Sequence, residues 1–321
     1  MKKNIVLFII CMTACIYISC DDSNAVLHDS IINDMEAPAY LQVQTNIAPT
    51  ISVTRSFLKT TMPNNAEMGL FARGLNDQLY CDVAGNNNVK SVYNGTSWTN
   101  TPQVILNREP ATIYAYYPYQ EGETDPEAVH INHTKRVDFL YGSNVLQSPK
   151  TSSSNPVASI NMKHAFAKLV FKLSKKNYAG KAQLDLISIW NVNGNNTLIS
   201  EGSINLKNGV ITKDPTKKGW AQATHHPDSR PLQIIPDTPS SNEADYPVIY
   251  VMPTLIRTGK EVEMSFSIDG QGYPFPVPAN TNWESGKKYV YNVVLSGTSI
   301  AAQNVTVADW NSGTNGNIDI N

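Results

Sequence analysis

The sequence is poor in charged residues, which make up 16% of its 321 residues, whereas about 25% is typical of soluble domains. Its net charge is only −2 at pH 7, so it lacks the strongly basic face that nucleic acid binding requires. We therefore expect no nucleic acid partner. Hydrophobic residues still make up 41%, which is enough for buried cores, and the length indicates two domains at ~150 residues each.

Sequence patterns for catalysis are also missing. There is no Gly-x-Ser-x-Gly turn, no His-Glu-x-x-His helix and no phosphate-binding loop. The histidines cluster only at His225–His226 and at His130–His133, without the spaced Cys or Glu residues that a zinc site needs, so we expect solvated side chains. No Asp-rich calcium loop is present. The sequence therefore predicts neither an enzyme nor a bound metal or cofactor.

The first twenty residues have the pattern of a targeting segment. Lys2 and Lys3 precede an apolar run at residues 5–18, which is shorter than the ~20 residues that span a bilayer. The run ends in Ser19-Cys20, and this pair resembles the lipobox of bacterial lipoproteins, which are cleaved before the cysteine and acylated on it. We interpret residues 1–20 as a lipoprotein signal peptide with lipidation on Cys20. The alternative is an ordinary secretory signal with a coincidental cysteine.

Cysteine is scarce, with four in the whole chain. Cys11 and Cys15 leave with the signal peptide and Cys20 carries the lipid, so Cys81 stays alone and no intrachain disulfide can form. We expect Cys81 to be a strand residue without chemistry. Residues 21–37 are polar and acidic, which is typical of a flexible tether.

What the sequence does contain is strand periodicity. Leu41, Val43, Thr45 and Ile47 alternate with polar residues, as in a half-buried strand. Residues 164–173 alternate in the same way, and we predict one strand there that opens a second β-domain after a polar linker at residues 148–156. No stretch of ten or more residues has helical periodicity. The sequence therefore predicts an all-β protein of two antiparallel sandwiches, with domains at residues 38–157 and 158–321.

Seven segments, in order along the chain, together resemble the fimbrillin family, the pilin-like lipoproteins of Bacteroidetes. They are Thr54–Ser56, Glu67–Ala72, Tyr114–Tyr119, Asp138–Gly142, Met162–Leu169, Trp283–Tyr289 and Val305–Asn311. The resemblance implies two tandem transthyretin-like β-sandwich domains. It also implies a precursor anchored to the outer membrane through Cys20, assembly with other fimbrial subunits by strand exchange, and a role in adhesion to a host or bacterial surface receptor.

In that family a trypsin-like protease cuts after a basic residue behind the first strand, which would be Arg55 here. Loss of the strand that carries Leu41, Val43, Thr45 and Ile47 would open an apolar slot for another subunit's terminal strand. The expected donor is Val305–Trp310 and onward, or the segment just before it. A sandwich that lacks one strand exposes unpaired backbone groups and so requires a partner. The alternative is a permanent first strand, which some anchor and tip members keep.

A second hypothesis is a lipid-anchored module that binds glycans. It rests on exposed aromatic side chains that could stack on sugars. Of the five tryptophans, Trp220 lies in the most polar surroundings, and we expect it to be the most exposed.

Overall fold

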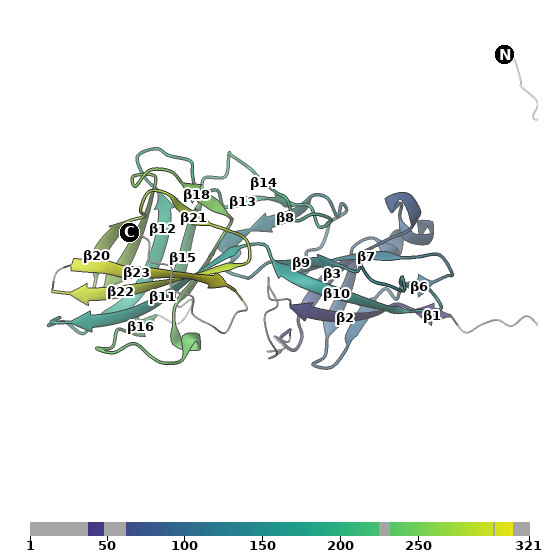
Figure 1. The fold of residues 1–321 in the computed structure, drawn as a ribbon, viewed down its shortest axis with the longest axis horizontal. Helices are drawn as coiled ribbons and strands as arrows, with labels where there is room; N and C mark the ends of the chain where they lie inside the picture. Colours follow the sequence, from purple (N-terminus) through teal and green to yellow (C-terminus); the bar gives the residue numbers. More distant parts are fainter. Residues whose placement is uncertain (1–37, 48–61, 225–231, 298, 311–321) are drawn as a thin grey trace, which may run out of the picture. The chain divides into compact units, whose positions relative to one another are not determined.

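The computed structural model of the protein describes residues 38–47, 62–224, 232–297 and 299–310. Residues 38–321 form one compact unit, in which strands are joined by turns and by short 3-10 helices (Figure 1). The predicted all-β class is confirmed. Cys20, Arg55 and His225–His226 lie outside the described residues. Within the described ranges, none of the helices has the length and apolar character needed to cross a bilayer.

The first half of this unit is built on a seven-stranded sheet with the order β2-β10-β9-β7-β3-β4-β5. Its strands are β2 (Gln42–Ile47), β3 (Glu67–Arg73), β4 (Val89–Tyr93), β5 (Trp98–Thr101), β7 (Thr112–Tyr117), β9 (Leu140–Ser143) and β10 (Val157–His164). A short ribbon of β1 (Ala39–Tyr40) and β6 (Ile105–Leu106) lies beside it. Inward side chains of these strands form one core, with Leu41, Leu70, Ile113 and Ile160 among its members.

The second half packs a four-stranded sheet against a five-stranded one. The first has the order β17-β11-β22-β23 and the second β15-β12-β19-β20, with β16 also paired to β12. The strands are β11 (Ala167–Lys176), β12 (Gln183–Asn191), β15 (Trp220–Thr224), β16 (Gln233–Ile234), β17 (Val248–Val251), β19 (Val262–Ile268), β20 (Gln271–Pro276), β22 (Lys287–Ser296) and β23 (Ser299–Asp309).

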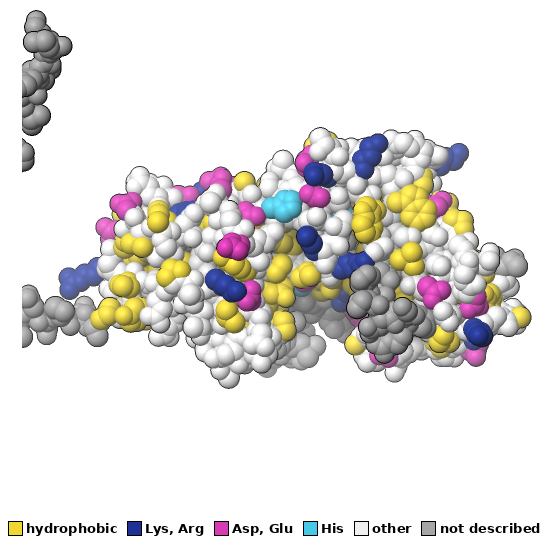
Figure 2. All heavy atoms as spheres, turned by 180° about the vertical axis from the view of Figure 1, so that it is seen from behind, with side chains coloured by type: hydrophobic (Ala, Val, Ile, Leu, Met, Phe, Trp, Pro, Cys, Tyr) yellow, Lys and Arg dark blue, Asp and Glu magenta, His cyan; other side chains and the backbone are white. Residues whose placement is uncertain are grey.

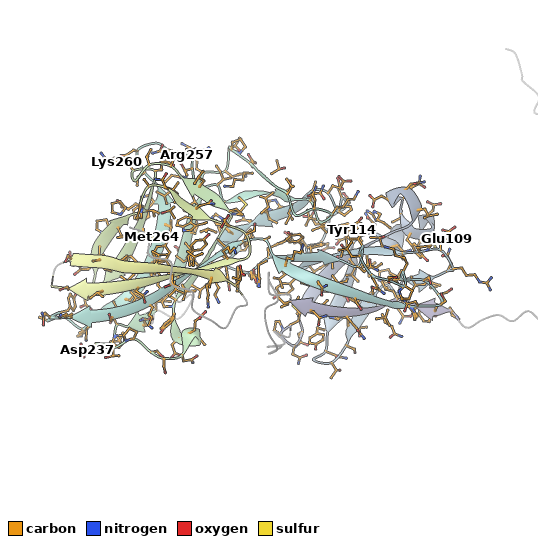
Figure 3. The ribbon with its side chains drawn as sticks, viewed as in Figure 1. Glu109, Tyr114, Asp237, Arg257, Lys260 and Met264 are labelled. Carbon is orange, nitrogen blue, oxygen red and sulfur yellow. The ribbon has the colours of Figure 1, made fainter. Side chains whose placement is uncertain are left out.

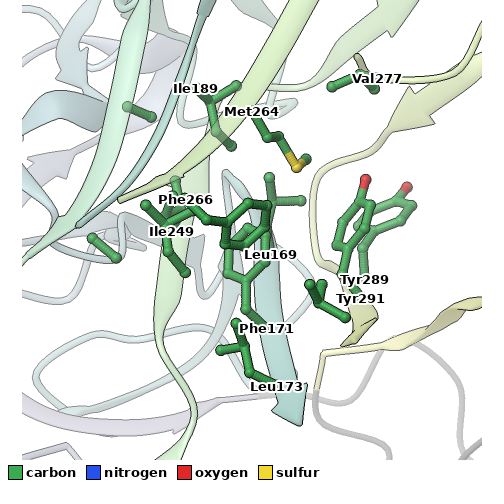
Figure 4. Packing of buried hydrophobic residues seen from close by; sticks show 14 of the residues in the cluster. Leu169, Phe171, Leu173, Ile189, Ile249, Met264, Phe266, Val277, Tyr289 and Tyr291 are labelled. Atoms are coloured by element: carbon green, nitrogen blue, oxygen red, sulfur yellow. The ribbon is translucent and has the colours of Figure 1, made fainter. Parts of the chain in front are cut away.

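Aromatic rings lie among aliphatic side chains in the core between these two sheets (Figure 4). Phe171 of β11 meets Phe266 of β19 edge-on at 5.7 Å between ring centroids and stacks on Tyr291 of β22 at 5.6 Å. The buried Tyr291 hydroxyl accepts a hydrogen bond of 2.9 Å from Nε1 of Trp283. Such edge-on and stacked pairs add stability beyond the burial of their area, and the two polar groups satisfy each other.

Prolines mark two edge strands of the second half. Pro247 and Pro253 flank β17, and β20 contains Pro274 and Pro276. Proline has no backbone N–H and cannot donate to a neighbouring strand, so within sheets it is confined mainly to edges. Both strands lie at the ends of their sheets, as this rule requires.

A third cluster of buried residues joins side chains of both halves. Tyr114 of β7 belongs to it, whereas Met264 of β19 belongs to the core of the second half (Figure 3). The strand β8 (Val129–Asn132) pairs with β13 (Glu201–Ile204), which pairs in turn with β14 (Ile211–Lys213). Two further strands, β18 (Thr254–Ile256) and β21 (Thr281–Trp283), form a small ribbon. The 3-10 helices are η1 (Leu75–Asp77), η2 (Tyr80–Asp82), η3 (Ala84–Asn86), η4 (His133–Lys135) and η5 (Glu243–Asp245).

The single strand predicted at residues 164–173 is wrong. His164 ends β10, and Ala167 begins β11 after a break at Ala165 and Phe166. Both residues of the break are buried in the third cluster, which a strand with one buried face does not allow. β10 pairs with β2 and β9, whereas β11 pairs with β17 and β22.

The segment 148–156 differs from the solvated linker that its composition predicts. Thr151 is buried, and its carbonyl oxygen accepts a hydrogen bond of 2.8 Å from the Ala111 N–H. Its hydroxyl accepts another from Asn144, at 2.9 Å. The prediction of antiparallel sheets also requires correction, because the β2–β10 and β11–β22 ladders are parallel. The domain boundaries stay a prediction.

Candidate functional site

The predicted first strand exists as β2 and lies at one end of the seven-stranded sheet. Leu41, just before it, and Val43 are 5% and 6% exposed and belong to the first core, while Thr45 and Ile47 are half-buried on the same face. The intervening polar residues are exposed. Alternation in the sequence therefore specifies which face of this strand is buried.

Among the described strands, β2 forms a backbone ladder along one of its edges only. It pairs with β10 in parallel register, from Gln42 opposite Val157 to Ile47 opposite Met162. Just before this ladder, the Leu41 N–H donates to the Val104 carbonyl and the Gln42 N–H to that of Pro156, both at 2.9 Å. An edge strand with one ladder can leave a sheet without breaking any other strand pair.

Side chains of β5, the strand at the other end of the same sheet, form the opposite wall around β2. Nε1 of Trp98 donates to the Thr45 hydroxyl at 3.1 Å, and Nδ2 of Asn100 donates to the Leu41 carbonyl at 2.9 Å. Asn100 is held in turn by the buried Ser91 hydroxyl, which donates to its Oδ1 at 2.7 Å. The wall thus presents fixed donors to whatever strand occupies this position.

Removal of β2 would take away the strand ladder of residues 157–162, in which Val157 and Ser159 would keep hydrogen bonds to the side chains of Gln147 and Thr151. The β10–β9 ladder covers only Lys163 opposite Tyr141 and His164 opposite Leu140, so β2 is the ladder partner of the six residues before them. Full burial of one Leu or Val side chain contributes about 1.5–3 kcal/mol. The two buried side chains of this segment therefore account for about 3–6 kcal/mol, a large fraction of a domain's stability.

The predicted donor region is an edge strand as well. β23 begins at Ser299, before the expected donor segment, ends at Asp309, and pairs antiparallel with β22. Ile300, Val305 and Val307 are partly buried against the second core. The Trp310 N–H then donates to the Gly286 carbonyl at 3.0 Å.

The histidines near residue 130 do not come together. His133 is 1% exposed, and its Nδ1 accepts from the Met252 N–H at 3.0 Å, which leaves Nε2–H to donate to the Trp220 carbonyl at 3.1 Å. Burial lowers the pKa of His133 to about 4, because a charge there would be desolvated. His130 instead lies in a shallow polar hollow with Glu201, Lys213 and other residues. Among the described residues, no group of His, Cys, Asp and Glu side chains could hold a metal ion.

Cys81 is exposed and lies in the 3-10 helix η2, not in the predicted strand. Its sulfur accepts a hydrogen bond of 3.3 Å from Nδ2 of Asn107. Partial burial, with nearby Glu109, raises the pKa of the thiol, so the thiolate needed for nucleophilic attack is disfavoured.

Of the tryptophans, Trp220 is 46% exposed, whereas Trp98 and Trp283 are buried. On the face seen in Figure 2, basic and acidic side chains are interspersed, with hydrophobic groups between them. What periodicity did not reveal is the position of Trp310, whose ring is stacked against His164 and Tyr250. His164, Tyr250 and Trp310 are far apart in the sequence, so no local pattern indicates that their rings are in contact.

Two solved structures show the same fold. A candidate cell adhesion protein from Bacteroides uniformis is 16% identical, with a TM-score of 0.58 over 85% of this chain and 99% of the other. A candidate cell adhesion protein from Bacteroides ovatus is 15% identical, with a TM-score of 0.55 over 87% of this chain and 100% of the other. A comparison with curated proteins gives no match.

A family model described as fimbrillin-like matches residues 54–310. The match covers most of the chain, including the strands from β3 to β23. The chain therefore belongs to the fimbrillin-like family.

Proposed function

We propose that the protein is a fimbrial subunit that is exported as a lipoprotein precursor and assembled on the cell surface by strand exchange. In this proposal β2 is a removable plug and the slot between β10 and β5 accepts a strand of another subunit. The lipid on Cys20 anchors the precursor to the outer membrane, a trypsin-like protease cuts after Arg55, and the assembled fimbria supports adhesion. Each half would be a transthyretin-like sandwich.

One observation carries this proposal: β2 has a single backbone ladder, while the groups that hold it on its other side belong to residues packed without it. The hydrogen bond between Ser91 and Asn100 involves no atom of β2 or Leu41, so it does not require their presence. An incoming strand with alternating apolar side chains would meet the same donors and the same core. Strand addition of this kind combines main-chain hydrogen bonds with pockets for alternate side chains.

The test is limited trypsin digestion of the purified precursor, followed by size-exclusion chromatography at increasing concentration. We expect cleavage after Arg55 to yield polymers, and Arg55→Gln to stay monomeric after the same treatment. Excess synthetic peptide of residues 38–47 should block polymer growth by refilling the slot. A cleaved chain that has lost β2 and stays monomeric at high concentration would overturn the proposal. Mass spectrometry of the mature protein would separate an acylated Cys20 start from a Ser56 start.

A second candidate function is glycan binding, which the exposure of Trp220 favours. Trp220 is the register partner of Trp190 on the neighbouring strand β12, and the inward positions of both strands are buried. Two aromatic side chains thus lie on the outer face of one sheet. Glycan-array binding that is lost in Trp220→Ala and kept in Val210→Ala, an exposed residue of another strand pair's turn, would support it. Binding that survives Trp220→Ala would exclude this face.

A further inference from the structure

The end of the described chain is clamped by side chains from three other strands. The ring of Trp310 lies 3.8 Å from that of His164, with an angle of 5° between the planes, and 5.5 Å from that of Tyr250, with an angle of 11°. Nζ of Lys168 lies 5.6 Å from the centre of the indole ring. Stacking and cation–π contacts of this geometry are attractive. We call His164, Lys168 and Tyr250 the Trp310 cradle.

Hydrogen bonds and ion pairs fix the cradle in position. Nδ1 of His164 lies 2.6 Å from Oδ2 of Asp138, which orients the imidazole ring. Lys168 and Tyr250 are register partners on adjacent strands, and Glu243 lies 3.9 Å from Lys168. The indole therefore meets a surface that is already ordered, so its stacking costs little rearrangement of the cradle.

The cradle is attached to the strand that holds β2. His164 is the last residue of β10, and the first six residues of β10 form the ladder with β2. β9 approaches this strand closely, because a Cβ at Gly142 would lie 2.4 Å from the Asn161 carbonyl oxygen. Yet its ladder with β10 has only two residue pairs. One strand thus contacts both ends of the described chain, and β2 is the ladder partner of its first six residues.

We propose that β10 couples the two ends of the chain, so that loss of β2 loosens the Trp310 cradle and eases the release of β23 from β22. When β2 leaves, residues 157–162 lose their ladder, β10 becomes more mobile, and His164 no longer holds a fixed position against the indole. While β2 is in place, it fills the slot and keeps β23 paired with β22. This inference rests on the proposed removal of β2 and adds a regulation to it: one cut prepares both the accepting slot and the donated strand.

The experiment is amide hydrogen exchange on the monomeric full-length chain, which needs neither cleavage nor polymerisation. Val43→Ala weakens β2 within the intact chain, and Gln44→Ala, at an exposed position of the same strand, is its matched control. We expect Val43→Ala and Trp310→Ala each to raise exchange in β23 by about tenfold, since local opening reports the lost contacts. Gln44→Ala should leave β23 unchanged, and Trp310→Phe should restore most of the protection.

The double variant decides the route of coupling. Once Trp310 is alanine, adding Val43→Ala should raise exchange in β23 no further, because the contact that transmits the change is gone. Exchange in β12 and β19 serves as the reference for global unfolding and should stay constant. Faster exchange in β2 and β10 with no change in β23 would overturn the coupling and leave the proposed function intact. If exchange in β2 and β23 is coupled but the cleaved chain never polymerises, the coupling stands and the proposed function is overturned.

Discussion

β2, near the start of the described chain, and β23, at its end, are both edge strands, but they are held in different ways. β2 has a ladder of six residue pairs, two buried side chains at its start and donors from β5 behind it. β23 has eleven residues in a longer antiparallel ladder, with side chains that are only partly buried and a stacked indole just after its end. Side-chain burial holds β2 in place, whereas backbone pairing and the stacking of Trp310 on its cradle hold β23.

This difference indicates which strand needs a chemical event for its release. Buried side chains in a preformed slot leave slowly, and once gone they expose apolar surface that favours a replacement. A long ladder with only partly buried side chains can instead peel from the C-terminal end of β23, starting beside Trp310. Substitutions in each strand test this difference.

The largest effect is expected from a charge on the buried face of β2. Val43→Asp should destabilise the protein by about 3 kcal/mol or more, because it buries a carboxylate without a partner. Val307→Asp, on the half-buried face of β23, should cost only about 1 kcal/mol, since the side chain can reach water. Urea unfolding of both variants measures the difference. Equal losses would show that the two strands are held alike.

The next largest effect is expected from pH, at His133, which lies where the two halves meet. The free energy of unfolding of both halves should change with pH there. The pKa of His133 is lowered to about 4 from an ordinary value near 6.5, so the unfolded chain binds its proton first as pH falls. Stability should therefore be full above pH 6.5 and be lost between about pH 6.5 and 4. That pKa difference is equivalent to about 3 kcal/mol.

The measurement is the free energy of unfolding as a function of pH for the wild type and for His133→Asn. The asparagine side-chain oxygen can still accept from the Met252 N–H but does not titrate. Its curve should be flatter between pH 4 and 6.5 and lower at pH 7. If both curves have the same slope, His133 is not the group that sets the pH dependence.

A medium effect should come from the wall behind β2. Asn100→Ala removes the donor to the Leu41 carbonyl and the acceptor of the Ser91 hydroxyl, which leaves two buried groups unsatisfied and should cost about 1–3 kcal/mol. Thr99→Ala, at an exposed position of the same strand, should be nearly neutral. Hydrogen exchange should rise in β2 and, through β10, in β23, while β12 and β19 stay protected. Damage that spreads equally to β12 and β19 would contradict the assignment of this wall to β2.

The smallest effect is expected at the ion pair between Lys287 and Asp309 at the end of β23. Lys287→Met should cost less than about 1 kcal/mol, because partly exposed pairs are weak and screened by salt. Thermal unfolding in low and high salt should show a difference between wild type and variant that shrinks as salt rises. A loss comparable to that of Asn100→Ala would mean that charge, and not the ladder, secures the last strand.

Local patterns in the sequence predicted the elements of this fold better than their partners. The alternation at residues 41–47 identifies β2 and its buried face. That β2 pairs with β10, more than a hundred residues away and in parallel, follows from packing and has no local sequence signal. The same is true of β11 and β22.

The errors have a common physical origin in burial that local composition hides. Ala165 and Phe166 continue an apolar alternation, yet both are buried in the third cluster and interrupt the strand. Thr151 lies in a polar run but is buried because Asn144 and Ala111 satisfy its polar groups. The Trp310 cradle was missed for a related reason, since it assembles residues from three separate strands.

The prolines beside β17 and within β20 limit the sideways growth of the two sheets of the second half. A proline cannot donate a backbone hydrogen bond, so an edge that contains or adjoins prolines is a poor template for another strand, and these margins resist sideways sheet extension. In the proposed fimbria, contacts between subunits would then be made mainly by the two ends of the chain. Such contacts produce a thin fibre, whereas a bundle would need sideways contacts between sheets.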